Sequence, residues 1–462
     1  MREDTSKQEP RRRKRKFSCL SRLLLIFIGL AVGLGLSELV IFAYYGLGLW
    51  LPLRQAPAYQ VDDTSIRLAI LGGSTSEGHP YNGAVPIPPH IKELNLIQPP
   101  EIGREFNLLT ITKYFLEQHF GYSNIKVDRY ARGGYSIKET MTKYWRSVTY
   151  KPDILVLYSG HNEYRRYHNQ GLYNAKTDTF WCRALAPLSG LGTVDLLLRY
   201  LYLRQASKTS VPVSIKDLFG DSVIPPSELV FNKYCYQQYI EKLIKHCQQK
   251  AIFLIIIIPE KNYLHSPIQS IYYGPADKKA LAERIFRKGH ELARSRSSDD
   301  QVKAQKIFEQ LLQFCSFANL YFELGKLHCH RRNFKLGQYY LGKAIDSGRF
   351  RSRITTEYQN ILRELIREYS VPYIDMYELI TKKIGRKIPD WSCFHDAVHL
   401  KLHVYEALSR EIIQTLRQHK CPKLTLPEKE LTITPEEWVE HFHLFPEIYR
   451  DQWPLPDGEK HN

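Results

Sequence analysis

Short polar blocks in this 462-residue chain carry side chains that could perform nucleophilic catalysis. The block GGSTSEG places Ser74 directly after an apolar run, and FHDAVHL, near the C-terminus, puts Asp396 and His399 three residues apart. A serine hydroxyl is a weak nucleophile until a base removes its proton. We expect His399 to be that base. Asp396 can hold the imidazole in the correct tautomer and stabilise its charged form.

Acyl transfer also needs hydrogen-bond donors aimed at the developing oxyanion. The blocks ARGGYS and GHNEY supply candidates. These are the backbone N–H of Gly134 and the side-chain amide of Asn162, together with the N–H of Ser74 itself. We expect Ser74 to lie where a strand turns into a helix, so that its oxygen can face the cleft. The helix N-terminus also favours the negative charge that develops nearby.

Each block alone has a plainer interpretation, since a Gly-Ser turn after a strand is more often structural than catalytic. A phosphate-binding loop would require Lys after Gly78, where the chain has His79. A metal site built from His79, His161 and His399 lacks a characteristic spacing. We therefore expect neither a metal nor another cofactor. His395 is a second possible base, but the DxxH spacing favours His399.

Apolar runs separated by amphipathic segments predict an α/β fold. The expected strands are Ile66–Leu71, Ile125–Tyr130, Asp153–Gly160, Ala251–Pro259 and Val371–Met376. The expected helices are 107–120, 136–150, Ser227–Gln249, Ile354–Tyr369 and Leu402–Gln418. Ser136 and Glu139 have the spacing of a capping box. Continuous apolar strands alternating with helices indicate a parallel sheet covered on both faces, with its site beyond the carboxyl ends of the strands.

Residues 277–350 interrupt this alternation with a helical insert. Its apolar and small residues follow the spacing of a tetratricopeptide repeat (TPR) at Tyr321, Leu324, Gly325, Phe334, Gly337, Leu341 and Ala344. The alternative is an ordinary helical hairpin. One or two repeats rarely bury a core alone, so we expect the insert to dock on the sheet domain.

The N-terminus predicts a membrane anchor. RRRKRK, at 11–16, precedes a long apolar stretch within 23–53. Such a stretch can span a bilayer, and basic residues before it favour a cytoplasmic N-terminus and an extracytoplasmic body. A cleaved signal peptide is the alternative, although no clear cleavage site is present.

The remaining positive charge of this +17 chain is spread out, so we expect no nucleic-acid binding. The eight cysteines form no CxxC pair, which argues against a zinc pattern or a small disulfide framework.

The four blocks together resemble those of the SGNH hydrolase (GDSL-like esterase/lipase) superfamily. This resemblance covers about 64–270 and 350–418 and implies a three-layer α/β/α flavodoxin-like fold. It also implies roles for the residues of the matching blocks: nucleophile Ser74, oxyanion donors Gly134 and Asn162, and the pair Asp396 and His399. GGSTSEGHPY with GHNEY is similar to a bacterial subgroup that has an N-terminal anchor and TPR repeats.

The chain departs from the family pattern at three places. Gly73 replaces the usual acidic residue before the serine, and Leu400 replaces a frequent proline after the histidine. Tyr130 or Ala131 occupies the place of a frequent asparagine in the second block. The last departure weakens the assignment of Gly134.

We expect six segments along the chain. They are a basic cytoplasmic tail (1–22), an anchor region (23–53), the first part of the hydrolase domain (64–276), the TPR-like insert (277–350), the second part of the hydrolase domain (351–420) and a C-terminal extension (421–462). The predicted function is a membrane-anchored extracytoplasmic serine ester hydrolase acting on small acyl esters. The alternatives are an O-acyltransferase acting on cell-surface glycans and a scaffold that binds a partner protein through the insert.

Overall fold

The computed structural model describes residues 27–33, 35–36, 59–62, 64–78, 106–163, 218–219, 226–267, 270–348, 353–434, 437 and 441–442. At its start, residues 27–33 and 35–36 are helical, and their large apolar side chains are exposed. Among the described residues, no helix has both the length and the apolar character needed to cross a bilayer. Most of the expected anchor, 23–53, lies outside the described residues, so the anchor stays a prediction.

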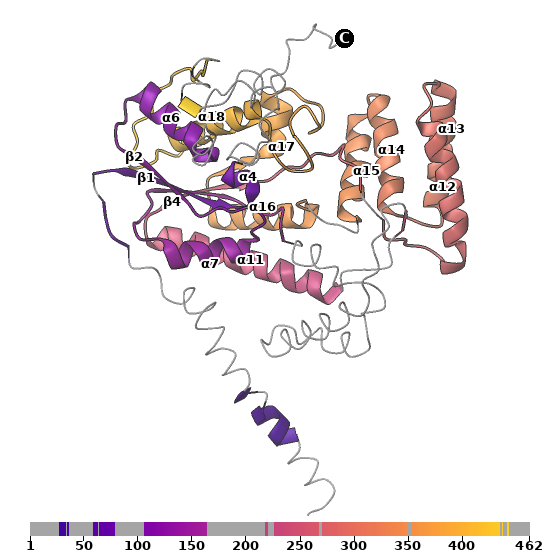
Figure 1. Ribbon diagram of the computed structural model, residues 1–462, viewed down its shortest axis with the longest axis horizontal. Coiled ribbons are helices and arrows are strands. Elements are labelled where there is room, and N and C mark those ends of the chain that lie inside the picture. The colour runs from indigo at the N-terminus through magenta and orange to yellow at the C-terminus, as the bar shows by residue number, and fades with distance from the viewer. Residues whose placement is uncertain are drawn as a thin grey trace, which may run out of the picture.

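In the part of the chain that the structure describes, a five-stranded sheet forms the centre of the fold (Figure 1). Its strands run in the order β2-β1-β3-β4-β5, and every pair is parallel. Their bounds are Ile66–Gly72 for β1, Ile125–Arg129 for β2, Ile154–Tyr158 for β3, Phe253–Ile258 for β4 and Tyr373–Asp375 for β5. The predicted parallel sheet is therefore confirmed, with strand ends that differ from the predicted ends by no more than two residues.

Helices cover both faces of the sheet, as Figure 1 shows. One face carries α6 (Leu108–Phe120) and α18 (Leu402–Gln418), and the other carries α7 (Ile137–Ser147), α11 (Pro226–Gln249) and α16 (Thr356–Tyr369). The capping box predicted for α7 is present, with Ser136 at the N-cap and Glu139 at the third helical position. The α/β class with helices on both faces is therefore as expected.

The two cores follow from the alternation of side chains along each strand. In β1, Leu68 and Ile70 join the core beneath α6 and α18, whereas Ala69 and Leu71 join the core beneath α7, α11 and α16. β4 is buried from Leu254 to Ile258 and divides its residues in the same way. A strand with both faces covered is mostly apolar, and β4 is apolar throughout. The exceptions are the buried Arg67 in β1 and the charged residues of the edge strand β2, which is only partly buried.

The insert consists of helices that pair as two hairpins beside the sheet domain (Figure 1). After the short helix η3 (Ala276–Lys278) come α12 (Lys279–Ala293), α13 (Ser298–Leu312), α14 (Ala318–His330) and α15 (Phe334–Asp346). Apolar residues of α14 and α15 share a cluster with Tyr263 and Ile388 of the sheet domain. The insert thus docks on that domain as expected. Its assignment as a tetratricopeptide repeat stays a prediction.

Short segments complete the described chain. After β5 come the helix α17 (Met376–Glu378) and the π-helical turn η4 (Leu379–Lys383). Leu426, Leu431 and Ile433, in the C-terminal extension, are buried in the core beneath α6 and α18. All five cysteines whose side chains the structure describes are free.

Candidate active site

Ser74 lies at a sharp turn beyond the carboxyl end of β1. The strand ends at Gly72, and Ser74 begins α4 (Ser74–Glu77), a helix of four residues. This one-turn helix is too short for a macrodipole of the expected kind, because the dipole is the sum of many aligned peptides. Any stabilisation of negative charge here must therefore come from individual N–H groups.

The structure brings Ser74, His399 and Asp396 together. Ser74 Oγ lies 2.7 Å from His399 Nε2, and His399 Nδ1 lies 2.6 Å from Asp396 Oδ2. Because Nδ1 faces a carboxylate, we assign the imidazole proton to Nδ1, which leaves Nε2 to accept the hydrogen bond from the serine hydroxyl. This is the arrangement in which a base can remove the serine proton.

Asp396 is held as a carboxylate by its own loop. Its Oδ1 accepts hydrogen bonds from the N–H groups of Val398 and His399, at 2.8 and 2.9 Å. Burial acts to raise the pKa of Asp396, but these bonds and the neighbouring His399 lower it below its ordinary value. The DxxH spacing therefore has a local explanation, since one carboxylate caps the loop and orients the histidine at its end.

The turn after β4 supports this loop and was not singled out from the sequence. Asn262 donates from its side chain to the carbonyl of Asp396 and from its backbone to the carbonyl of Ala397, at 3.1 and 3.0 Å. The guanidinium of Arg353 in turn donates to the carbonyl of Asn262 at 3.0 Å. The rule that sites form at the carboxyl ends of parallel strands would have directed attention to the polar run PEKNY after β4.

Asn162 packs against the serine turn. Its Nδ2 donates to the carbonyl of Tyr135 at 3.2 Å, which leaves its second N–H for another acceptor. A Cβ on Gly73 would lie only 2.5 Å from this Nδ2. A side chain at position 73 would therefore have to displace the amide of Asn162, and glycine leaves room for that amide beside the serine.

Gly134 lies in the loop between β2 and α7, with a left-handed φ of 81°. A Cβ on its neighbour Gly133 would lie 3.9 Å from Ser74 Cβ, so this loop passes beside the serine. Within the described part of the chain, the N–H groups of Ser74 and Gly134 have no hydrogen-bond acceptor. The structure thus brings the predicted donors to one region of the serine turn.

Glu163 and His161 flank Asn162 and have perturbed protonation. Glu163 accepts a hydrogen bond from the N–H of Ile137 at the start of α7, at 3.1 Å, and burial raises its pKa to about 8. His161 accepts a hydrogen bond at Nδ1 from the N–H of Ile354, and burial lowers its pKa to about 3. His161 is therefore neutral near pH 7, with its proton on Nε2.

The metal site considered from the sequence combines His79, His161 and His399. In the described residues, no group of three His, Cys, Asp or Glu side chains could hold a metal ion, and His79 lies outside them.

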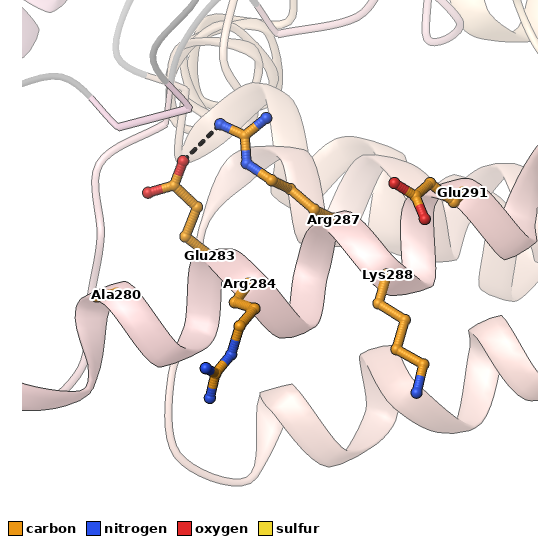
Figure 2. Close-up of a pocket in the computed structure, with 6 residues that line it drawn as sticks. All are labelled: Ala280, Glu283, Arg284, Arg287, Lys288 and Glu291. Atoms are coloured by element: carbon orange, nitrogen blue, oxygen red, sulfur yellow. Dashed lines mark hydrogen bonds and ion pairs between the residues drawn. The ribbon is translucent and has the colours of Figure 1, made fainter.

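A separate surface hollow lies along α12 and is lined by Ala280, Glu283, Arg284, Arg287, Lys288 and Glu291. All come from one helix, and Glu283 pairs with Arg287 while Arg284 and Lys288 point elsewhere (Figure 2). These groups do not converge on a ligand.

No protein-family model and no curated protein sequence matches the chain. Solved structures similar to it include a lipase/acylhydrolase from Enterococcus faecalis, at 11% identity and a TM-score of 0.32, covering 79% of this chain and 100% of that one. An acetyl xylan esterase is similar at 10% identity and a TM-score of 0.33, with 76% and 100% covered. A GDSL-like lipase from Bacteroides thetaiotaomicron has 9% identity and a TM-score of 0.29, with 82% and 98% covered. The function is therefore inferred from the geometry of the site itself.

Proposed function

We propose that the protein is an SGNH-type serine ester hydrolase that acts through an acyl-Ser74 intermediate. The observation that carries this proposal is the continuous chain of hydrogen bonds from Ser74 Oγ through His399 to Asp396. Hydrogen bonds among a serine, a histidine and an aspartate can also serve only to stabilise a fold. Here, however, the serine lies at the carboxyl edge of a parallel sheet, where ligands bind. The N–H groups of Ser74 and Gly134, which have no acceptor in the described part of the chain, add to this support.

The proposed reaction has two halves. His399 Nε2 takes the Ser74 proton as Oγ attacks the ester carbonyl, and the N–H groups of Ser74, Gly134 and Asn162 stabilise the oxyanion. The imidazolium then gives its proton to the leaving alkoxide, and the acyl group remains on Ser74. In the second half, His399 activates water, which releases the carboxylic acid and restores the serine. Small acyl esters are the proposed substrates.

Labelling with a fluorophosphonate tests the nucleophile directly, because only an activated serine displaces its fluoride. Wild-type protein should be labelled, whereas Ser74→Ala and His399→Ala should not. Ser76→Ala is a matched control in the same turn, since the Ser76 hydroxyl donates to the carbonyl of Tyr158 in the interior. His395→Ala tests the alternative base and should keep labelling. A well-folded wild-type protein that stays unlabelled would overturn the proposal.

We also propose, on the grounds of the sequence alone, that residues 23–53 hold the enzyme at a membrane. The basic run at 11–16 and the apolar stretch that follows support this proposal. Full-length chain should stay with membranes after extraction with alkaline carbonate, whereas a chain lacking residues 1–54 should be released. Release of both would contradict the anchor without affecting the proposed chemistry.

A further inference from the structure

Glu77 makes a contact that the proposed mechanism does not use. It is the last residue of α4 and follows Ser74 by about one helical turn. Its carboxylate oxygen Oε2 accepts a hydrogen bond from the backbone N–H of Gly133 at 2.5 Å. The contact joins the turn that carries the serine to the loop that carries Gly134.

This contact decides which N–H group of the loop is free. Gly133 and Gly134 are adjacent, and either backbone N–H could in principle face an oxyanion beside Ser74. Glu77 occupies the N–H of Gly133, whereas that of Gly134 has no acceptor among the described residues. The carboxylate therefore selects the donor that remains available to a substrate.

The same loop is fixed on either side of Gly133. The N–H of Arg132 donates to the carbonyl of Gly72 at 3.2 Å, and the carbonyl of Tyr135 accepts from Asn162. Glu77 holds the residue between these two contacts. Removing its acceptor would free the peptide next to Gly134 while leaving both ends of the loop attached.

We propose that Glu77 is a positioning residue that binds the Gly133 N–H and so presents the Gly134 N–H to the oxyanion formed at Ser74. The inference rests on the proposed function. The proposed role of Glu77 requires an acceptor oxygen at this place and no negative charge. A carboxylate near the developing oxyanion would in fact disfavour it, because like charges repel. Gln has a side chain of the same length with an acceptor oxygen, so it should replace Glu77.

The test compares Glu77→Ala and Glu77→Gln in the full chain, with p-nitrophenyl acetate as substrate. We expect Glu77→Ala to lower kcat by about 10- to 100-fold with KM within about 2-fold, since a displaced catalytic donor is costly to the transition state alone. Phenylboronic acid forms an anionic tetrahedral adduct with serine. Its inhibition constant should rise by a similar factor, because the adduct would be bound more weakly. Glu77→Gln should stay within about 3-fold of wild type in all three quantities. Hydrogen exchange at Gly133 should quicken in Glu77→Ala only.

Glu139→Ala is the matched structural control, because Glu139 also accepts a backbone N–H at this loop, that of Ser136 at the start of α7. It should lower the melting temperature while kcat stays within about 3-fold. Unchanged kcat in Glu77→Ala, or an equal loss in Glu77→Gln, would overturn the inference while labelling of Ser74 kept the proposed function intact. An unlabelled wild-type protein would overturn both.

Discussion

Ser74 Oγ lies 2.7 Å from His399 Nε2, although 325 positions separate the two residues in the chain. β1 ends at Gly72, two positions before Ser74, and His399 lies three positions before Leu402, the first residue of α18. The buried hydroxyl of Tyr405 in α18 donates to the carbonyl of Thr75 at 2.7 Å, which ties α18 to the serine turn. The packing of α18 therefore sets the distance between the nucleophile and its base.

Asp396→Asn should lower kcat by about 10³- to 10⁴-fold, because an amide cannot stabilise the imidazolium and favours the wrong tautomer. The loop itself should persist, since the amide oxygen can still accept the N–H groups of Val398 and His399. Asp390→Asn is the control, because Asp390 caps its own turn by accepting the N–H of Ser392 and belongs to the same segment. Equal kcat values for the two variants would contradict the role of Asp396.

Asn162→Ala should lower kcat by about 100-fold, the usual effect of losing one oxyanion donor. Gly73→Ala should lower it similarly, because the new Cβ would displace the Asn162 amide. The double variant relieves that clash, so its loss should not exceed the loss in Asn162→Ala. A loss in the double variant equal to the product of the two single losses would show that Gly73 and Asn162 act independently.

Glu163→Gln should change how stability depends on pH. Burial raises the pKa of Glu163 from an ordinary value of 4.5 to about 8, so between these values the unfolded chain loses a proton that the folded chain keeps. The wild-type free energy of unfolding should therefore fall as pH rises through this window, at up to about 1.4 kcal/mol per pH unit from this group, and level off above it. Glu163→Gln removes this contribution. Urea denaturation at pH 5 to 8 measures the difference between the proteins, which should grow with pH; a constant difference would contradict the prediction.

The ion pair of Lys261 and Glu260 is buried, with the two side chains 0% and 2% exposed and their charged atoms 3.7 Å apart. Lys261 also donates to Gln359 at 3.0 Å. Burial raises the pKa of Glu260 and lowers that of Lys261, because desolvation disfavours the charged form of each side chain. Lys261→Met should lower the free energy of unfolding by about 3–5 kcal/mol, because it leaves a buried carboxylate unpaired.

The control for that variant is Lys382→Met. Lys382 pairs with Glu378 on the surface, where the two side chains are 69% and 55% exposed. Its loss should cost less than about 1 kcal/mol. Urea denaturation measures the loss in free energy of unfolding for both variants. Equal losses would contradict the prediction that breaking the buried pair destabilises the protein more than breaking the surface pair.

Gly325→Ala should destabilise the insert, because the added Cβ would lie 2.5 Å from Leu341 Cγ where α14 and α15 cross. Overpacking of this kind typically costs about 1–3 kcal/mol. Gly342→Ala is the control in α15, since its nearest contact would be an ordinary 4.0 Å to Tyr263. That change should be neutral or stabilising by up to about 1 kcal/mol through helix propensity. Thermal melts should separate the two variants, and equal shifts would contradict the close crossing.

Sequence alone determined the class of the fold and the candidates for chemistry. Runs that are apolar throughout must be buried on both faces, so they specified parallel strands and, at their carboxyl ends, the polar blocks that contain Ser74, Gly134 and Asn162. The pairing of Asp396 with His399 was also readable, because three residues of one loop bring the two side chains together and the carboxylate caps that loop.

Only the tertiary structure decided what joins these blocks. The contact of Glu77 with Gly133, the packing of Asn162 over Gly73 and the support of Asp396 by Asn262 each connect residues from different elements. Burial likewise depends on every element packed around a side chain, so the neutral His161 and the interior pair of Glu260 and Lys261 carried no local signal. Periodicity reports which face of an element is apolar, whereas distances across elements depend on how those faces pack together.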